Sequence, residues 1–287
     1  MGGERAAIIE KDLAQIADML LINGTLTECP GLVHGKMGIV VFFFHYARYT
    51  GNELFADYAM DLFSEMLNQI HVNSPADYSK GLAGMGVGID YLIRNDFLNA
   101  EDDICEDFDG RMFRAVMYDP WPDFSQYDGL TGYGRYWMTR LRYQAPSAPA
   151  RKCLLRIVGL IEERLSGISP DEQTDVYCFL HDLQKTNSFN VETQCIASLR
   201  EQLQLADVQS FSRLGNSDVG NIVRMAQQCR YFNHDLHDEI DTALRQIPGL
   251  DMEKAPAGMG LFSGYAGEGI LRLTALGQMN MLWGNLL

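Results

Sequence analysis

Two carboxylates and a histidine stand beside glycine-rich motifs, where they could take part in acid–base chemistry. Asp128 directly precedes the motif that begins at Gly129, and Glu268 follows the motif that begins at Gly260. Paired carboxylates, one acting as acid and the other as base or nucleophile, carry out glycoside hydrolysis. His34 lies in a His-Gly pair in the first motif and is a third catalytic candidate.

Each of these residues also has a structural interpretation. An aspartate just before a helix caps the first backbone N–H groups and faces the positive end of the helix dipole, which suits Asp77 and Asp128. His34 could equally serve as a turn or capping residue. The residue types leave both interpretations open.

Aromatic and cationic side chains lie near the same motifs, and we expect them to bind a substrate. These candidates are Tyr78, Tyr127, Tyr133, Arg135 and Tyr265.

Cysteine and histidine spacings give little support for a metal site. Cys178 and His181 form a C-x-x-H pair, and Cys229 precedes His234 and His237. Neither group supplies a complete ligand set, and such spacings arise often in helices. We therefore predict no metal and no cofactor.

Glycine-rich motifs recur with a period of about fifty residues, which fits one helical hairpin per repeat. A degenerate copy lies at residues 214–220, and the wide gap before it suggests that one copy has eroded. The clear copies are residues 31–38, 81–88, 129–134 and 260–267.

Helical patterns follow and separate the motifs. Apolar residues in 54–70 recur at three- and four-residue steps, and 153–165 and 191–203 are similar. The β-branched and aromatic run 39–44 favours a strand, but its place after a motif predicts a buried helix. Glycines at i, i+4 and i+7 in the first and last copies predict one stripe of a helix in close contact with its neighbours. Unrelated glycine turns are the alternative.

Composition narrows the class of protein. The net charge of −15 and the pI near 4.7 argue against nucleic acid as a partner. The longest apolar run is too short to span a membrane, and the N-terminus lacks the apolar region of a signal peptide. Six scattered cysteines indicate a reducing compartment. We expect a cytoplasmic protein with a single domain spanning residues 1–287 and no membrane partner.

The motifs and their register resemble the lanthionine synthetase C-like family, most closely at residues 81–88 and 260–273. The resemblance covers most of residues 25–145 and 205–280. It implies an all-α fold, an α/α toroid of helical hairpins with glycine-rich motifs at the starts of the inner helices. It also implies that the candidate site residues line a central cavity.

Catalytic members of this family bind zinc through a Cys in a Trp-Cys-Tyr-Gly-like segment and through a later Cys-His pair. Zinc there activates a peptide thiolate for addition to a dehydrated Ser or Thr. In this chain no Trp has a neighbouring Cys, and no Cys is followed directly by a His. Gly215 and Asn216 stand where the Cys-His pair would be. We therefore predict a protein of ribosomal peptide modification that binds a peptide substrate or partner protein without zinc-dependent cyclase activity.

Two alternatives remain. One is a carbohydrate-active toroid that uses paired carboxylates, and the other is a non-catalytic interaction scaffold. The sequence does not decide whether the protein is an enzyme.

Overall fold

The computed structural model describes residues 3–99, 104–143, 148–186, 193–203, 218–251, 258–262 and 264–287. These residues form helices and connecting loops, with no β-strand among them, which confirms the all-α prediction. The chain divides into two compact units. Unit 1 comprises Met1–His71 and Phe211–Leu287, and unit 2 comprises Val72–Ser210.

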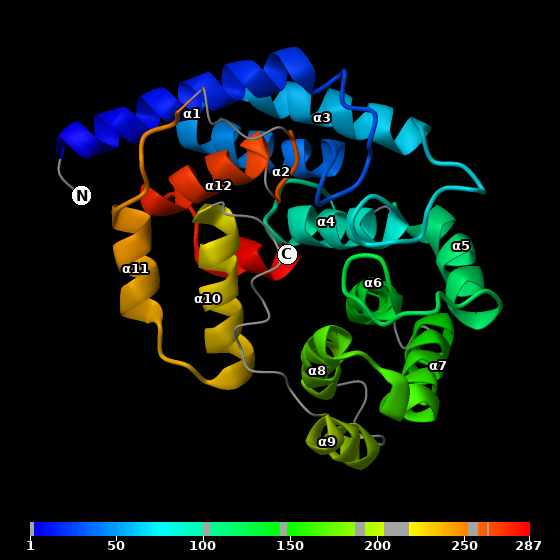
Figure 1. Cartoon of the computed structure of the whole chain (residues 1–287). Coiled ribbons are helices and arrows are strands. Elements are labelled where there is room, and N and C mark those ends of the chain that lie inside the picture. Colours follow the sequence, from blue (N-terminus) through cyan, green and yellow to red (C-terminus); the bar gives the residue numbers. More distant parts are fainter. Residues whose placement is uncertain are drawn as a thin grey trace. The chain divides into compact units, whose positions relative to one another are not determined.

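Unit 1 joins the two ends of the chain. Helix α2 packs against α3 and α12, and α12 also contacts α1, α10 and α11 (Figure 1). Its helices are α1 (Gly3–Asn23), α2 (Lys36–Thr50), α3 (Glu53–Asn68), α10 (Asp218–Phe232), α11 (His237–Arg245), α12 (Tyr265–Ala275) and the 3-10 helix η4 (Met281–Leu286).

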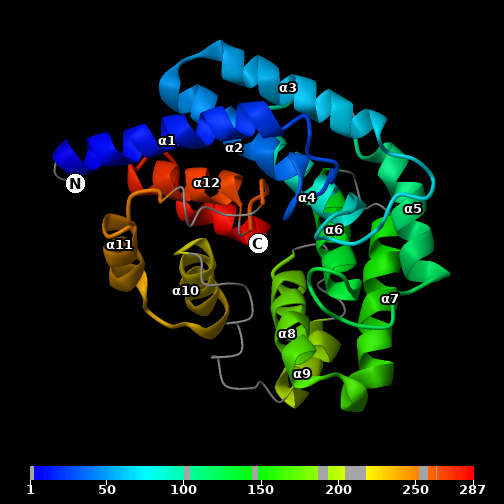
Figure 2. The same cartoon turned by 45° about the horizontal axis from the view of Figure 1, so that its top comes forward.

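Unit 2 is built from consecutive helices. Helix α6 packs against α4, α7 and α8, while α5 contacts α7 and α9 contacts α8 (Figure 2). Its helices are α4 (Leu82–Arg94), α5 (Glu106–Met117), α6 (Leu130–Tyr143), α7 (Ala148–Arg164), η1 (Leu165–Gly167), α8 (Pro170–Gln184) and α9 (Thr193–Gln202).

The apolar run 39–44 is helical, as predicted, and lies within α2. All six of its side chains are buried, because α3 and α12 pack on this helix from different sides. A strand preference is overridden here by tertiary packing. The amphipathic segment 54–70 likewise corresponds to α3.

Four glycines occupy equivalent places at helix starts. In each case the first helical N–H donates to the carbonyl seven residues earlier, across a tight loop. The donor–acceptor pairs are Lys36 and Cys29 (2.8 Å), Leu82 and Pro75 (2.9 Å), Leu130 and Asp123 (3.1 Å), and Tyr265 and Gly258 (3.1 Å). The helix-start glycines are therefore Gly35, Gly81, Gly129 and Gly264. We call the seven residues ending at each of them a helix-start loop.

This geometry corrects the register expected for the first and last copies. Gly31 and Gly260 lie inside loops, whereas Gly35 and Gly264 are the N-cap residues of α2 and α12. The glycines of these copies thus do not form a stripe along one helix. Of the degenerate copy, residues 214–217 lie outside the described residues.

Glycines inside the helices do mediate the predicted close contact between neighbours. A Cβ on Gly86 of α4 would overlap the Tyr136 ring of α6, and one on Gly134 of α6 would overlap the Phe179 ring of α8. In unit 1 the corresponding glycine is Gly269 of α12, which faces the ring of Phe42 in α2. Successive helices of this set therefore interlock in the same way.

Candidate functional site

The helix-start loops contact one another through their backbones. In unit 2 the N–H of Ser79 donates to the carbonyl of Tyr127 at 2.9 Å. In unit 1 the N–H of Phe262 donates to the carbonyl of Val33 at 3.0 Å. All four residues stand two positions before a helix-start glycine. The loops that carry His34, Tyr78, Tyr127 and Asp128 are thus held in a repeated arrangement.

Two carboxylates meet at a serine in unit 2. The Ser79 hydroxyl lies 2.9 Å from Oδ1 of Asp77 and 2.9 Å from Oδ1 of Asp128. Because a hydroxyl carries a single hydrogen, it donates to only one carboxylate at a time. Asp77 also accepts a hydrogen bond from the Lys80 N–H at 2.7 Å, so it braces its own loop rather than capping α4. Asp128 is exposed, and its carboxylate has room for a further hydrogen-bond donor.

Aromatic residues and an arginine lie beside these acids. The Arg135 guanidinium stands 4.7 Å from the centre of the buried Tyr78 ring, which makes an edge contact with the Tyr127 ring. Burial raises the pKa of Tyr127, although the positive charge of Arg135 acts in the opposite direction. The Tyr127 phenol therefore stays protonated at neutral pH and can donate a hydrogen bond.

Tyr133 projects from α6 toward the acidic side of the same cluster. Burial raises its pKa, and the negative charge of Asp77 raises it further, with smaller contributions from Asp123 and Asp128. Arg111 has the opposite effect. Like Tyr127, Tyr133 can act as a hydrogen-bond donor but not as a phenolate.

The candidates in unit 1 have different surroundings. His34 is exposed and directly precedes Gly35, the same position that Asp128 has before Gly129. Tyr265 is buried and is the first residue of α12. Tyr133 and Glu268 are also equivalent, since each is the fourth residue after a helix-start glycine.

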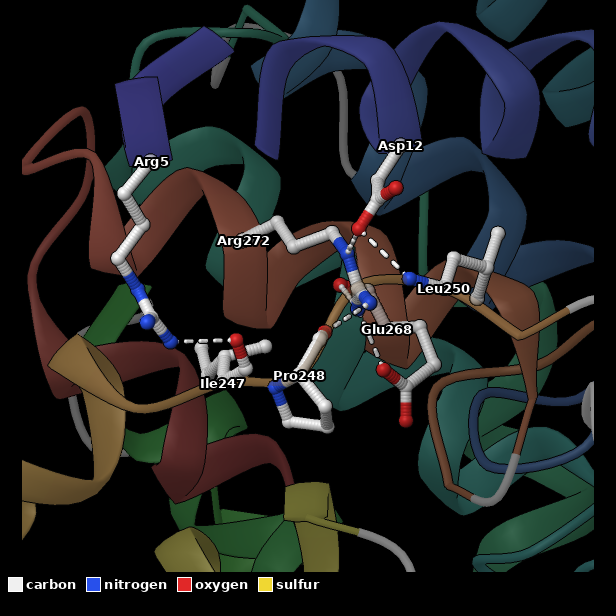
Figure 3. Close-up of polar contacts among 7 residues, drawn as sticks. All are labelled: Arg5, Asp12, Ile247, Pro248, Leu250, Glu268 and Arg272. Carbon is white, nitrogen blue, oxygen red and sulfur yellow. Dashed lines mark hydrogen bonds and ion pairs between the residues drawn. The ribbon is translucent and has the colours of Figure 1, made fainter. Parts of the chain in front are cut away.

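Glu268 belongs to a buried ion-pair network (Figure 3). Arg272, only 2% exposed, lies between Glu268 (2.5 Å) and Asp12 of α1 (3.1 Å). Arg272 also donates to the Pro248 carbonyl, and Asp12 accepts from the Leu250 N–H. The network fastens residues 248–250 to α1 and α12, so the contacts of Glu268 are structural.

The predicted site residues therefore belong to two different units of the chain. Unit 2 brings together Asp128, Tyr78, Tyr127, Tyr133 and Arg135, whereas His34, Tyr265 and Glu268 belong to unit 1. The acid–base pair of Asp128 and Glu268 stays a prediction. Sequence reasoning missed Ser79, because only the pairing of two loops places its hydroxyl between two acids.

The positions aligned with the zinc ligands of the family hold no Cys or His. The described part of the chain offers no other cluster of metal-ligating side chains. Gly215 and Asn216 lie outside the described residues. Within the described ranges, no three His, Cys, Asp or Glu side chains gather closely enough to hold a metal ion. None of the described helices is both long and apolar enough to cross a membrane.

Comparison of the chain with protein-family models, curated proteins and solved structures gives no significant match.

Proposed function

We propose that this chain is a lanthionine synthetase C-like protein in which the even-numbered helices form the inner ring of an α/α toroid. The glycine contacts support this arrangement. Helix α12 meets α2 through Gly269 and Phe42 just as α4 meets α6 through Gly86 and Tyr136. The last inner helix thus packs on the first as consecutive inner helices pack on each other, which is the relation that a closed ring requires.

The two units fit this proposal as two arcs of inner helices. One arc is α10, α12 and α2, and the other is α4, α6 and α8. The odd-numbered helices contact these arcs as an outer layer would; they are α1, α3, α5, α7, α9 and α11.

We propose that the helix-start loops of this toroid bind a peptide. The observation that carries the proposal is the junction of Asp77, Ser79 and Asp128, with the Tyr127 ring beside it. Carboxylates accept charge-assisted hydrogen bonds from peptide N–H groups and from Lys or Arg side chains. Phenol groups that stay protonated add donors for peptide carbonyls.

Zinc-dependent cyclisation is not part of the proposed function. The residues aligned with the Cys-His ligands, Gly215 and Asn216, offer neither a thiolate nor an imidazole. The protein would instead bind a peptide that undergoes modification.

Fluorescence anisotropy with labelled synthetic peptides tests this function. We expect Lys- and Arg-containing peptides to bind more tightly than Glu-containing peptides of matched length. Asp128→Asn should weaken binding of the basic peptides about tenfold, because it removes one charge-assisted hydrogen bond worth about 1.4 kcal/mol. Glu163→Gln, which neutralises an exposed acid on α7, is the matched control. Equal affinity for both peptide types, or no effect of Asp128→Asn, would contradict the proposal.

A further inference from the structure

Two carboxylates at the start of α8 bind the backbone of the helix-start loop 123–129. Glu172 accepts from the N–H of Phe124 at 2.8 Å, and Asp175 accepts from the N–H of Gln126 at 2.9 Å. The same loop carries Tyr127 and Asp128. Its attachment to α8 therefore fixes one side of the candidate site.

The Asp175 side chain accepts a hydrogen bond that a backbone carbonyl accepts in the neighbouring repeat. Gln126 stands three residues before Gly129, as Tyr78 stands three residues before Gly81. The N–H of Tyr78 donates to the backbone carbonyl of Tyr127 at 2.9 Å, whereas the equivalent N–H of Gln126 donates to the Asp175 carboxylate. The donor is the same in both pairs of repeats, and only the acceptor differs.

The position of Asp175 in α8 is a glycine position in α6. Tyr136 and Phe179 are equivalent residues, since each meets the glycine of the preceding helix. Four residues before them stand Gly132 and Asp175 respectively. A Cβ on Gly132 would overlap the Gln126 carbonyl oxygen of the helix-start loop of α6 and would lie 2.8 Å from the Cβ of Tyr78, so these two loops occupy that space. In α8 the Asp175 side chain takes this space and reaches the loop.

The start of α8 differs from the other helix starts at the place where the acceptor changes from a backbone carbonyl to a carboxylate. Helix α8 begins with a capping box, in which Ser169 and Glu172 bond each other's backbone N–H groups, and Pro170 is its first residue. This start has a capping box in place of a helix-start glycine, and here the Gln126 N–H donates to a carboxylate.

Charge around Asp175 is balanced between opposing effects. The pKa of its carboxyl is raised from 3.8 to about 7, with burial as the largest cause, while the Gln126 N–H and the Arg135 guanidinium act in the opposite direction. Glu172 and Asp171 on the same helix raise it further. A carboxylate in such surroundings is costly unless it is hydrogen-bonded, and the Gln126 N–H supplies such a bond.

We infer that Glu172 and Asp175 are positioning residues that hold the Tyr127–Asp128 loop on α8 in the geometry that binds peptide. The use of the loop for peptide rests on the proposed function. The attachment of this loop to α8 does not depend on a ligand, so it can be tested without any peptide.

Hydrogen exchange of the Gln126 amide, measured by NMR on the full chain, tests the hold. Asp175→Ala should speed exchange of this amide about tenfold or more, because its acceptor is lost. Asp175→Asn keeps an acceptor oxygen and should restore most of the protection. It also serves if the alanine variant fails to fold. The Leu82 amide, bonded to Pro75, should not change in any variant, and Glu163→Gln should leave both amides unchanged.

Unchanged protection of Gln126 in Asp175→Ala would overturn the inference. So would faster exchange that leaves the affinity for a basic peptide the same as in the wild type. Restored affinity in Asp175→Asn separates positioning from a general loss of stability. If the wild type binds no peptide, the proposed function fails, while the exchange data still decide whether Asp175 holds the loop.

Discussion

Asp128 and Glu268 carry the same functional group, but their surroundings give them different roles. Asp128 is exposed and contacts a serine hydroxyl, so a carboxylate oxygen remains available to a ligand. Glu268 pairs with the buried Arg272 and supports the packing of α1 on α12. The same distinction applies to the tyrosines, because Tyr127 and Tyr133 have raised pKa values and stay protonated. At the scale of single residues, the contacts that a side chain makes distinguish its role more than its residue type does.

Asp175 should make stability depend on pH near neutrality. Its folded-state pKa is raised from 3.8 to about 7, so between these values the folded chain keeps a proton that the unfolded chain has released. The contribution of Asp175 is therefore most favourable below pH 4 and is lost as the pH rises to about 7. Relative to Asp175→Asn, the wild type should lose about 1–2 kcal/mol of unfolding free energy over this range, a figure reduced for residual solvent contact.

Urea unfolding of both proteins at a series of pH values measures this difference. Subtracting the variant removes the contribution of the other acids, which titrate alike in the two proteins. A difference that stays constant between pH 4 and pH 8 would show that Asp175 is charged throughout.

The helix-start loop is the element that the sequence predicted best and still aligned wrongly. The first motif contains both Gly31 and Gly35, and either could match Gly81 on spacing alone. The hydrogen bond from the Lys36 N–H to the Cys29 carbonyl selects Gly35. A choice between two glycines four residues apart depends on where the chain turns, and the side-chain pattern does not record that.

Gly81→Ala should destabilise unit 2. The new Cβ would overlap the Pro75 carbonyl and lie 2.8 Å from the Asp77 carbonyl oxygen, and these backbone atoms cannot rotate away. We expect a loss of about 2–3 kcal/mol in unfolding free energy, typical of overpacking. Gly159→Ala in α7 is the matched control, because nothing lies within 4 Å of its added Cβ. That variant should gain about 0.5–1 kcal/mol from helix propensity.

Thermal and urea denaturation of the two variants provide the comparison. Equal stability of Gly81→Ala and the wild type would mean that the loop relaxes freely, and the proposed role of the glycine would then be wrong.

At the scale of the whole molecule, the informative feature is the contact between a glycine of one helix and an aromatic ring of the next, which recurs in both units. Each unit contains a run of interlocked helices, and the run in unit 1 crosses from the C-terminal α12 to the N-terminal α2. Contact between distant parts of a chain through a repeated interface is what distinguishes a proposed ring from an open stack of hairpins.

Small-angle X-ray scattering tests the proposed toroid. If the two units close into one compact ring, the radius of gyration should be about 19 Å, the value expected for a compact chain of this length. Units that move independently on their two connections would give a value several ångströms larger and a bimodal distance distribution. That outcome would contradict the toroid and the single-domain prediction together.

The sequence by itself determined the helical class, the helix after each motif and the side chains beside the motifs. These features follow from short-range periodicity and from the special stereochemistry of glycine. Only the tertiary structure decided the register of the first and last motifs and the place of Ser79 between two acids. It also decided that Asp175 occupies the position in α8 that Gly132 has in α6. The register depends on which carbonyl each first helical N–H reaches across its loop. The places of Ser79 and Asp175 depend on contacts between residues 49 positions apart, which packing between repeats brings together and no local pattern encodes.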